Sequence, residues 1–328
     1  MNRVARVFVA GGTTLPGRAL IDLLRAERFT NVVGIGAAEP DLSDPAATDA
    51  FFAATRPECV FLCAGMSGGI GLNRAAPVEL MRDNLLTTAN VLHAAHRFGS
   101  TKLLYLASSC AYPKHAPQPM RVESLGTGAV EPTSEAYATA KFAGWKLCDA
   151  YRREYGCKFV TGFPANAFGP HDDFGPDSGH VIPALIRRAH DAKTRGDADL
   201  VVWGSGTPRR EFVHSRDLAR ACLFVAENYD DEAPINLGGG TDVSIAEVAR
   251  AVAEVVGFRG RLRFDSTKPD GAPLKALDST PLLEMGWRPE VDFRAALAAT
   301  YDWFLRHRAG GIRPLPLRER VAGASPDG

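Results

Sequence analysis

The sequence contains no long apolar run, no excess of charge of either sign and no cysteine-rich motif. Its 38 basic and 38 acidic side chains give a formal net charge of zero, so general attraction to nucleic acid or to an anionic membrane is not expected. No stretch approaches the roughly 20 apolar residues that span a bilayer, and the first apolar run, Val7–Ala10, is too short for a secretory signal. We therefore expect a cytoplasmic protein with no nucleic-acid or membrane partner.

The six cysteines form no C-x-x-C pair and no cluster with histidine at the spacing of metal ligands. Free thiols in a reducing compartment fit this pattern best, and we predict no metal site.

The 328 residues exceed the length of one simple core, and their pattern predicts two α/β units. Over the first 165 residues, short apolar runs alternate with helical patterns, which is typical of a doubly wound parallel sheet of the Rossmann type. We assign residues 1–165, with parts of about 212–255, to a dinucleotide-binding domain. A smaller C-terminal α/β substrate lobe takes about 166–211 and 256–315, and 316–328 form a flexible tail. A capping box at Ser244–Glu247 predicts a helix start.

A glycine turn follows the first predicted strand. Gly11, Thr14 and Gly17 follow a G-x-x-G-x-x-G spacing in which threonine replaces the middle glycine. In a Rossmann unit, such a turn brings backbone N–H groups and a helix dipole to the cofactor pyrophosphate, and the Thr14 hydroxyl could bond a phosphate. Residues Gly34–Glu39, after the second strand, contain no arginine and only a late glutamate, which leaves the choice between NAD and NADP open.

Tyr137 and Lys141 form a Y-x-x-x-K pair on one face of a predicted helix. A nearby ammonium lowers the pKa of a phenol, which would suit Tyr137 to exchange a proton with a substrate oxygen. Ser108 stands at the carboxyl end of an apolar strand, where open α/β sheets bind ligands, and would hydrogen-bond a substrate carbonyl. The order of turn, serine and tyrosine–lysine helix predicts a nicotinamide-dependent enzyme.

Longer motifs resemble one family, GDP-L-fucose synthase, within the extended short-chain dehydrogenase/reductases. The resemblance covers about Arg6 to Leu305 and is carried by Ser67–Ile70, Ser108–Lys114, Asn166–Asp172, Ser178–Ala184, Val202–Phe212 and Lys268–Gly271. It implies a homodimer, formed through the helices at 77–98 and 134–155, which acts on a GDP-linked 4-keto-6-deoxy sugar with NADP, NAD not being excluded.

The resemblance also implies site residues. It assigns catalysis to Ser108, Cys110, Tyr137, Lys141 and His180, with Cys110 and His180 as acid and base of epimerisation at C3 and C5. It assigns the cofactor to Gly11, Thr13, Thr14, Leu15, Gly17, Ala64, Tyr137, Lys141, Pro164, Asn166 and His180. It assigns the substrate to Ser109, Asn166, Arg188, Trp203, Arg210 and Lys268.

The sequence departs from the family pattern at the cofactor end. Thr13 stands where the family has an arginine, and Ala37 where it has a second one, and both arginines are associated with the 2′-phosphate of NADP. Met66 replaces a common lysine. Two alternatives therefore stay open: an enzyme for a GDP-4-keto-6-deoxy-heptose or related sugar that acts only as epimerase or only as reductase, and a non-catalytic nicotinamide sensor.

Overall fold

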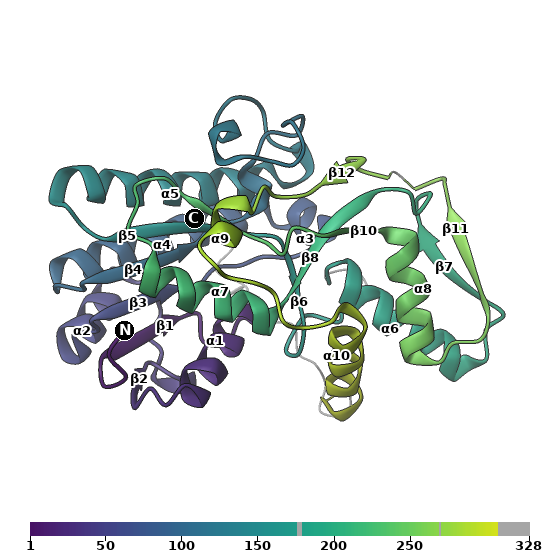
Figure 1. The fold of residues 1–328 in the computed structure, drawn as a ribbon, viewed down its shortest axis with the longest axis horizontal. Coiled ribbons are helices and arrows are strands. Elements are labelled where there is room, and N and C mark those ends of the chain that lie inside the picture. Colours follow the sequence, from purple (N-terminus) through teal and green to yellow (C-terminus); the bar gives the residue numbers. More distant parts are fainter. Residues whose placement is uncertain (176–178, 269, 308–328) are drawn as a thin grey trace, which may run out of the picture.

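A six-stranded parallel sheet forms the centre of the computed structural model, which describes residues 1–175, 179–268 and 270–307. Figure 1 shows the sheet, whose strand order is β2-β1-β3-β4-β5-β9. Five of its strands are almost entirely buried because helices cover both faces of the sheet. The edge strand β2 is partly exposed. The strands are β1 (Arg6–Ala10), β2 (Asn31–Val33), β3 (Cys59–Leu62), β4 (Lys102–Leu106), β5 (Phe159–Pro164) and β9 (Ile235–Leu237).

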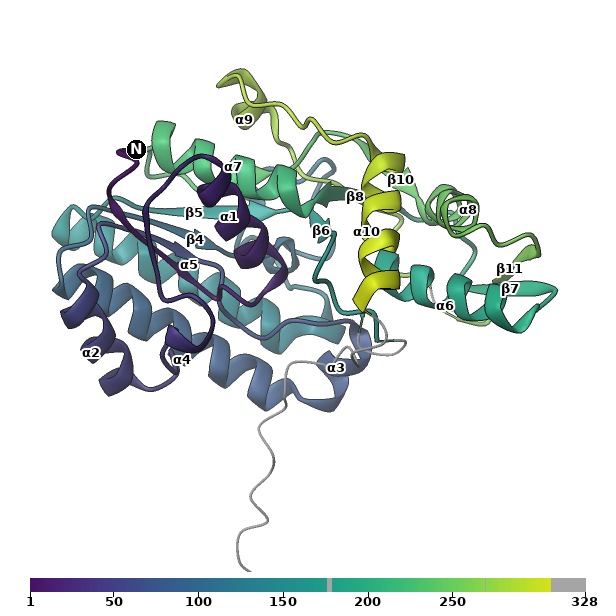
Figure 2. The ribbon, with the colours of Figure 1, turned by 90° about the horizontal axis from the view of Figure 1, so that it is seen from below.

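Helices cover the two faces of this sheet. Figure 2 shows α1 (Leu15–Ala26) and α7 (Ser215–Asn228) on one face. The other face carries α2 (Pro45–Thr55), α4 (Pro77–Arg97) and α5 (Glu135–Tyr155). This arrangement confirms the predicted doubly wound α/β fold. Among the described residues, no helix has the length and apolarity needed to cross a membrane.

A second buried cluster of apolar side chains lies beside the first. It is built by α6 (Val181–Arg195), α8 (Ile245–Val256) and α10 (Phe293–His307), with the parallel pair β7 (Asp199–Trp203) and β11 (Arg261–Asp265). A further sheet forms around β8 (Arg209–His214), which pairs with β6 (Asn166–Phe168), β10 (Asp242–Ser244) and β12 (Leu274–Lys275). Two short helices complete the named elements, α3 (Ile70–Ala75) and α9 (Thr280–Glu284).

Neither cluster is continuous in the sequence. The capping box at Ser244 is present, but the helix it begins, α8, packs its apolar face in the second cluster. Leu277, Leu282 and Trp287 instead lie in the first cluster. The chain thus crosses back to the central sheet after β12, a long-range return that local sequence patterns do not encode. The predicted tail at 316–328 lies outside the described residues.

Candidate active site

The predicted site residues follow the carboxyl ends of neighbouring strands. β1, β3, β4 and β5 run parallel and are hydrogen-bonded in sequence, so the segments after them meet at one edge of the sheet. The strand order reverses between β1 and β3, the kind of point at which open α/β sheets bind ligands. The glycine turn, Ala64, Ser108 and Pro164 all lie at this edge.

The glycine turn between β1 and α1 is packed too closely for side chains. A Cβ atom on Gly11, where φ is 85°, would lie 2.5 Å from the backbone of Ala64, and one on Gly17 would lie 2.0 Å from the Gly11 carbonyl oxygen. Because these positions carry no side chain, the backbone of the turn can approach a ligand at the N-terminus of α1, as dinucleotide binding requires. Thr13 is exposed at the tip of the turn, and Leu15 begins α1. These residues fit a bound nicotinamide dinucleotide.

Thr14 serves the turn itself. Its hydroxyl donates to the Gly11 carbonyl oxygen at 2.7 Å and accepts from the Gly17 N–H at 3.2 Å. Both contacts follow from its place as the N-cap residue of α1. The hydroxyl suggested by the sequence as a phosphate ligand is thus already engaged in the turn.

Ser108 and Tyr137 are joined at the end of β4. The Ser108 side chain hydrogen-bonds the Tyr137 phenol, and its Oγ also accepts from the Cys110 N–H at 3.2 Å. Ser109 lies buried in the single turn that follows. Burial and the nearby Cys110 raise the pKa of Tyr137 above its ordinary value, and the Ser108 contact offsets this only in part. The predicted lowering of this pKa is therefore wrong, because burial dominates.

Lys141 lies one turn further along α5, as its spacing predicts. Its Nζ donates to the Leu106 carbonyl oxygen at 3.2 Å and lies 5.9 Å from the Tyr137 ring centroid. Burial lowers the pKa of Lys141 to about 8, although Cys63 opposes the shift. A backbone carbonyl of β4 thus orients the ammonium. The ammonium does not bring the pKa of the Tyr137 phenol below its ordinary value.

Asn84 was missed by sequence reasoning, yet it reaches the same place. This α4 side chain is 1% exposed, and its Oδ1 has no hydrogen-bond partner in the described structure. A Cβ atom built on Gly65 would lie 2.2 Å from that Oδ1 and 3.3 Å from the Lys141 Nζ. The two polar groups therefore approach the same glycine. A lone asparagine in a helix carries no local signal for such a position.

Cys110 lies beside a lysine that the sequence did not reveal. The Lys275 Nζ donates to the Cys110 Sγ at 3.5 Å. Burial makes the largest single contribution and raises the pKa of Cys110. The Lys275 charge and the hydrogen bonds with Ser108, Lys275 and Ser134 lower it, and together they outweigh burial. The net pKa lies below that of an ordinary thiol. A thiol of this kind exchanges protons readily near neutral pH.

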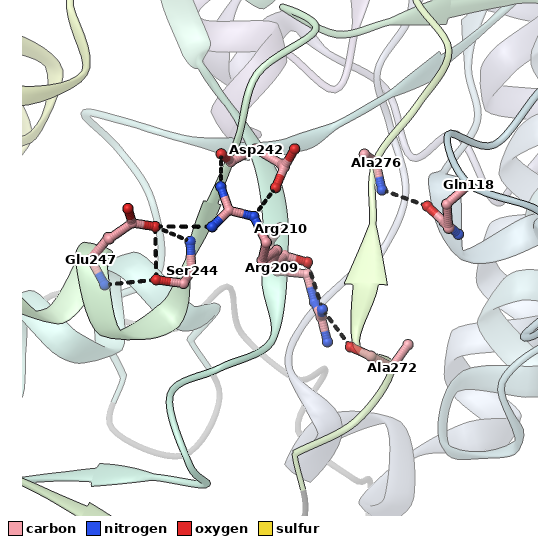
Figure 3. A network of polar contacts seen from close by, with 8 residues as sticks. All are labelled: Gln118, Arg209, Arg210, Asp242, Ser244, Glu247, Ala272 and Ala276. Carbon is pink, nitrogen blue, oxygen red and sulfur yellow. Dashed lines mark hydrogen bonds and ion pairs between the residues drawn. The ribbon is translucent and has the colours of Figure 1, made fainter.

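Backbone contacts on both sides fix the position of Lys275. β12 pairs with β8 so that Lys275 stands opposite Arg210. The Ala276 N–H donates to Gln118 Oε1 at 3.0 Å, as Figure 3 shows, and the Leu277 N–H donates to a carboxylate oxygen of the buried Glu211 at 2.7 Å. The only sequence signal for this lysine is that it interrupts the apolar run Leu274–Leu277, a weak one.

Replacing Lys275 by methionine tests its effect on the thiol. Because the Lys275 charge lowers the pKa of Cys110, Lys275→Met should raise that pKa. The alkylation rate of Cys110 at neutral pH should then fall by on the order of tenfold, because less of the thiol is ionised. The measurement is the rate of iodoacetamide alkylation at Cys110 against pH, read by mass spectrometry of its peptide. Lys114→Met, which removes an exposed lysine paired with Glu131, should leave the profile unchanged. An unshifted Lys275→Met profile would contradict the assignment.

His180 is the N-cap residue of α6 and makes no side-chain capping bond. The residue is exposed on one side, but the surrounding protein atoms desolvate the ring and lower its pKa; Asp173 opposes this, and the Lys275 charge adds to the lowering. The Lys275 charge therefore lowers the pKa of both Cys110 and His180, although only the thiol is in hydrogen-bond contact with it. Ser178, in the motif that precedes His180, lies outside the described residues.

Three predicted substrate residues gather around an exposed indole. Trp203 is 58% exposed, and the Arg188 guanidinium carbon and Lys268 Nζ lie 5.5 and 5.8 Å from the centroids of its rings. Arg210, on β8, is held by the backbone: its Nη1 donates to the Ala272 carbonyl oxygen at 2.7 Å (Figure 3). Asn166, on β6, donates to the Glu211 carbonyl oxygen at 2.8 Å. Pro269, in the Lys268–Gly271 motif, lies outside the described residues.

The structure thus brings the predicted residues together in two groups, one around Ser108, Cys110, Tyr137 and Lys141, and the other around Trp203. Lys275 contacts the first group through Cys110. Within the described ranges, no set of three or more His, Cys, Asp or Glu side chains is placed to hold a metal ion.

Comparisons with known proteins agree with this geometry. The model of the NAD dependent epimerase/dehydratase family matches residues 7–238. GDP-L-fucose synthase 1 of Arabidopsis thaliana is 46% identical over 93% of this chain and 95% of its own length. A GDP-L-fucose synthetase from Naegleria fowleri, solved with NADP, superposes with a TM-score of 0.88 at 30% identity, over 95% of this chain and 98% of that one. A GDP-6-OMe-4-keto-L-xylo-heptose reductase from C. jejuni superposes equally well, with a TM-score of 0.88 at 29% identity, over 94% and 99% of the two chains. The chain belongs to the NAD dependent epimerase/dehydratase family and, within it, to the GDP-L-fucose synthase family.

Proposed function

We propose that the protein converts GDP-4-keto-6-deoxy-D-mannose to GDP-L-fucose, by epimerisation at C3 and C5 followed by reduction at C4. The observation that carries this proposal is the Lys275–Cys110 contact beside the Ser108–Tyr137 pair. It sets a thiol of lowered pKa next to two hydroxyls suited to hold a ketone oxygen. The names of the relatives supply the substrate class.

Epimerisation needs a stabilised enolate and two proton carriers. The protons at C3 and C5 flank the C4 ketone, so they become acidic when hydrogen bonds hold the carbonyl oxygen. The hydroxyls of Ser108 and Tyr137 would donate these bonds. Cys110 and His180 then remove and return protons on opposite faces of the sugar, each with a pKa shifted by burial and by Lys275.

Reduction uses the same ketone oxygen. The glycine turn, Ala64, Pro164 and Lys141 would hold the dinucleotide at the carboxyl edge of the sheet. When bound, NADP supplies the hydride that reduces C4. Because burial keeps the pKa of Tyr137 high, its phenol is protonated at neutral pH and can give its proton to the C4 oxygen. A raised pKa suits an acid, which is the role that reduction requires.

The residues around Trp203 suit the nucleotide part of the substrate. An exposed indole offers a face for a purine to stack on, and the Arg188 and Lys268 cations beside it match the charge of a diphosphate. Arg210 stands opposite Lys275, the lysine that contacts the thiol. We place the GDP moiety along this path.

The heptose alternative rests on the C. jejuni reductase, which superposes on the chain as well as the N. fowleri enzyme does. A pure reductase has no need of a thiol with a lowered pKa. The Lys275–Cys110 contact therefore favours epimerisation together with reduction, and it also argues against a non-catalytic sensor.

We further propose a cytoplasmic homodimer formed through α4 and α5. Both helices are long and pack against each other, and they expose Val78, Met81, Leu86 and Tyr155. Burying such side chains favours association. All six cysteines are unpaired, in keeping with a reducing compartment.

Incubation with GDP-4-keto-6-deoxymannose in heavy water tests the activity. We expect deuterium at C3 and C5 in the absence of reduced cofactor, and loss of cofactor absorbance with formation of GDP-L-fucose in its presence. Reduction without label at either carbon would replace the proposal with a C4 reductase. Dinucleotide binding with neither label nor turnover on any keto sugar would indicate a sensor.

A further inference from the structure

The side chain of Glu39 contacts the glycine turn of the cofactor site. Its carboxylate accepts a hydrogen bond from the Gly11 N–H and a further one from the Gly12 N–H. Glu39 follows the end of β2 by a short loop and comes about 20 residues after the glycine turn. This is the place from which an acidic residue of a Rossmann unit bonds the adenosine ribose.

The path of the chain after β2 brings Glu39 to the turn. β2 ends at Val33, and Gly34, the next residue, turns the chain with a φ of 71°. A Cβ atom on Gly34 would lie 2.6 Å from the Phe8 ring, so the chain passes tightly over β1. A single 3₁₀ turn at Gly36–Ala38 follows, closed by the Glu39 N–H donating to the Gly36 carbonyl oxygen at 3.1 Å.

The chemistry of a carboxylate at this point favours a ribose diol. A carboxylate has two oxygens and about four acceptor sites, so it can hold the two amides and still accept from the 2′- and 3′-hydroxyls. A 2′-phosphate has no proton to give at neutral pH and carries negative charge, so it is repelled there. Burial raises the pKa of Glu39, and the hydrogen bonds from the Gly11 and Gly12 N–H groups, which favour the ionised carboxylate, offset part of this rise.

The neighbouring segments supply no cation that would offset the repulsion between Glu39 and a 2′-phosphate. Neither the turn at 11–17 nor the loop at 31–41 contains a lysine or an arginine. The nearest arginine in sequence, Arg18, acts on His171, whose pKa its charge lowers, and its buried Nε has no partner in the described structure. Ala37, in the loop itself, is exposed.

From this geometry we infer that Glu39 accepts hydrogen bonds from the adenosine ribose hydroxyls of the cofactor, so that the protein binds NAD(H) at least as tightly as NADP(H). NADP remains a cofactor; what the protein lacks is discrimination against NAD. The inference rests on the proposed function for the presence of the dinucleotide, and goes beyond it in naming the specificity residue.

Direct binding tests the inference independently of turnover. Isothermal titration of the full-length protein with NAD⁺ and with NADP⁺ should give a Kd for NAD⁺ equal to or below that for NADP⁺. Glu39→Gln keeps the side-chain size and removes the charge, so the ratio of the two Kd values should shift toward NADP⁺ by on the order of tenfold. Ala37→Arg, which adds a cation to the same loop, should shift it in the same direction.

Asp41→Asn is the matched control, because Asp41 lies in the same loop but accepts from the N–H and hydroxyl of Ser43. It should leave the ratio unchanged. Wild-type protein that binds NADP⁺ more than tenfold tighter than NAD⁺, or a folded Glu39→Gln variant with the wild-type ratio, would overturn the inference while leaving the proposed activity intact. Binding of neither dinucleotide would instead refute the proposed function.

Discussion

Cys110→Ala is expected to slow deuterium entry at C3 and C5 of the keto sugar by 10²- to 10⁴-fold, the usual contribution of a positioned acid or base. The structure gives the reason: the Cys110 thiol contacts Lys275 and Ser108, which lower its pKa despite burial. Alanine keeps the backbone of the turn and removes the only thiol at this point of the described site. The label is read by NMR or mass spectrometry of the recovered sugar nucleotide.

Cys157→Ala provides a matched control. Cys157 is also partly buried and also contacts a basic group, with its Sγ 3.4 Å from His96 Nδ1, but it lies before β5 at the opposite edge of the sheet. It should exchange at the wild-type rate. Wild-type exchange by Cys110→Ala itself would remove the thiol from the mechanism, and reduced exchange in both variants would point to a structural effect.

Tyr137→Phe is expected to abolish most of the C4 reduction, by 10²- to 10⁴-fold, because it deletes the proton that the ketone oxygen receives. Label uptake should fall less, since Ser108 still donates to that oxygen. The tyrosine is partly buried and its pKa is raised, so the rate should show no loss attributable to its ionisation at neutral pH. Oxidation of reduced cofactor, followed by its absorbance, measures the effect.

The control for this variant lies on the same helix. Tyr151, whose hydroxyl contacts His93 Nδ1 at 3.0 Å, is remote from Ser108, and Tyr151→Phe should reduce at the wild-type rate. The Tyr137→Phe protein should still bind the dinucleotide, which shows that the site is folded. If it reduces the keto sugar as fast as wild type, another group delivers the proton.

Local patterns in the sequence predicted the parts of the fold that depend on local physics. Buried parallel strands, the Thr14-capped turn and the Ser244 capping box each follow from adjacent residues. The Tyr137–Lys141 pair needed only helical spacing. By contrast, Lys275 reaches Cys110 across 165 residues, and no local pattern encodes that contact.

Electrostatics were predicted less well than positions. The sequence suggested that Lys141 lowers the pKa of Tyr137, but burial, a property of the whole fold, decides the opposite sign. The same limit applies to Glu39, which in sequence is merely a late glutamate. Only the sharp path at Gly34 brings its carboxylate to the Gly11 amide.

The two-residue strand β12 brings a side chain of the β8 sheet to the end of the central sheet. Cys110 follows the central sheet, whereas Lys275 belongs to the sheet built on β8. The acidity of a thiol in one layer is therefore set by the backbone position of another. The relative position of the two sheets therefore decides how acidic this thiol is, because the lysine that lowers its pKa and the thiol belong to different layers.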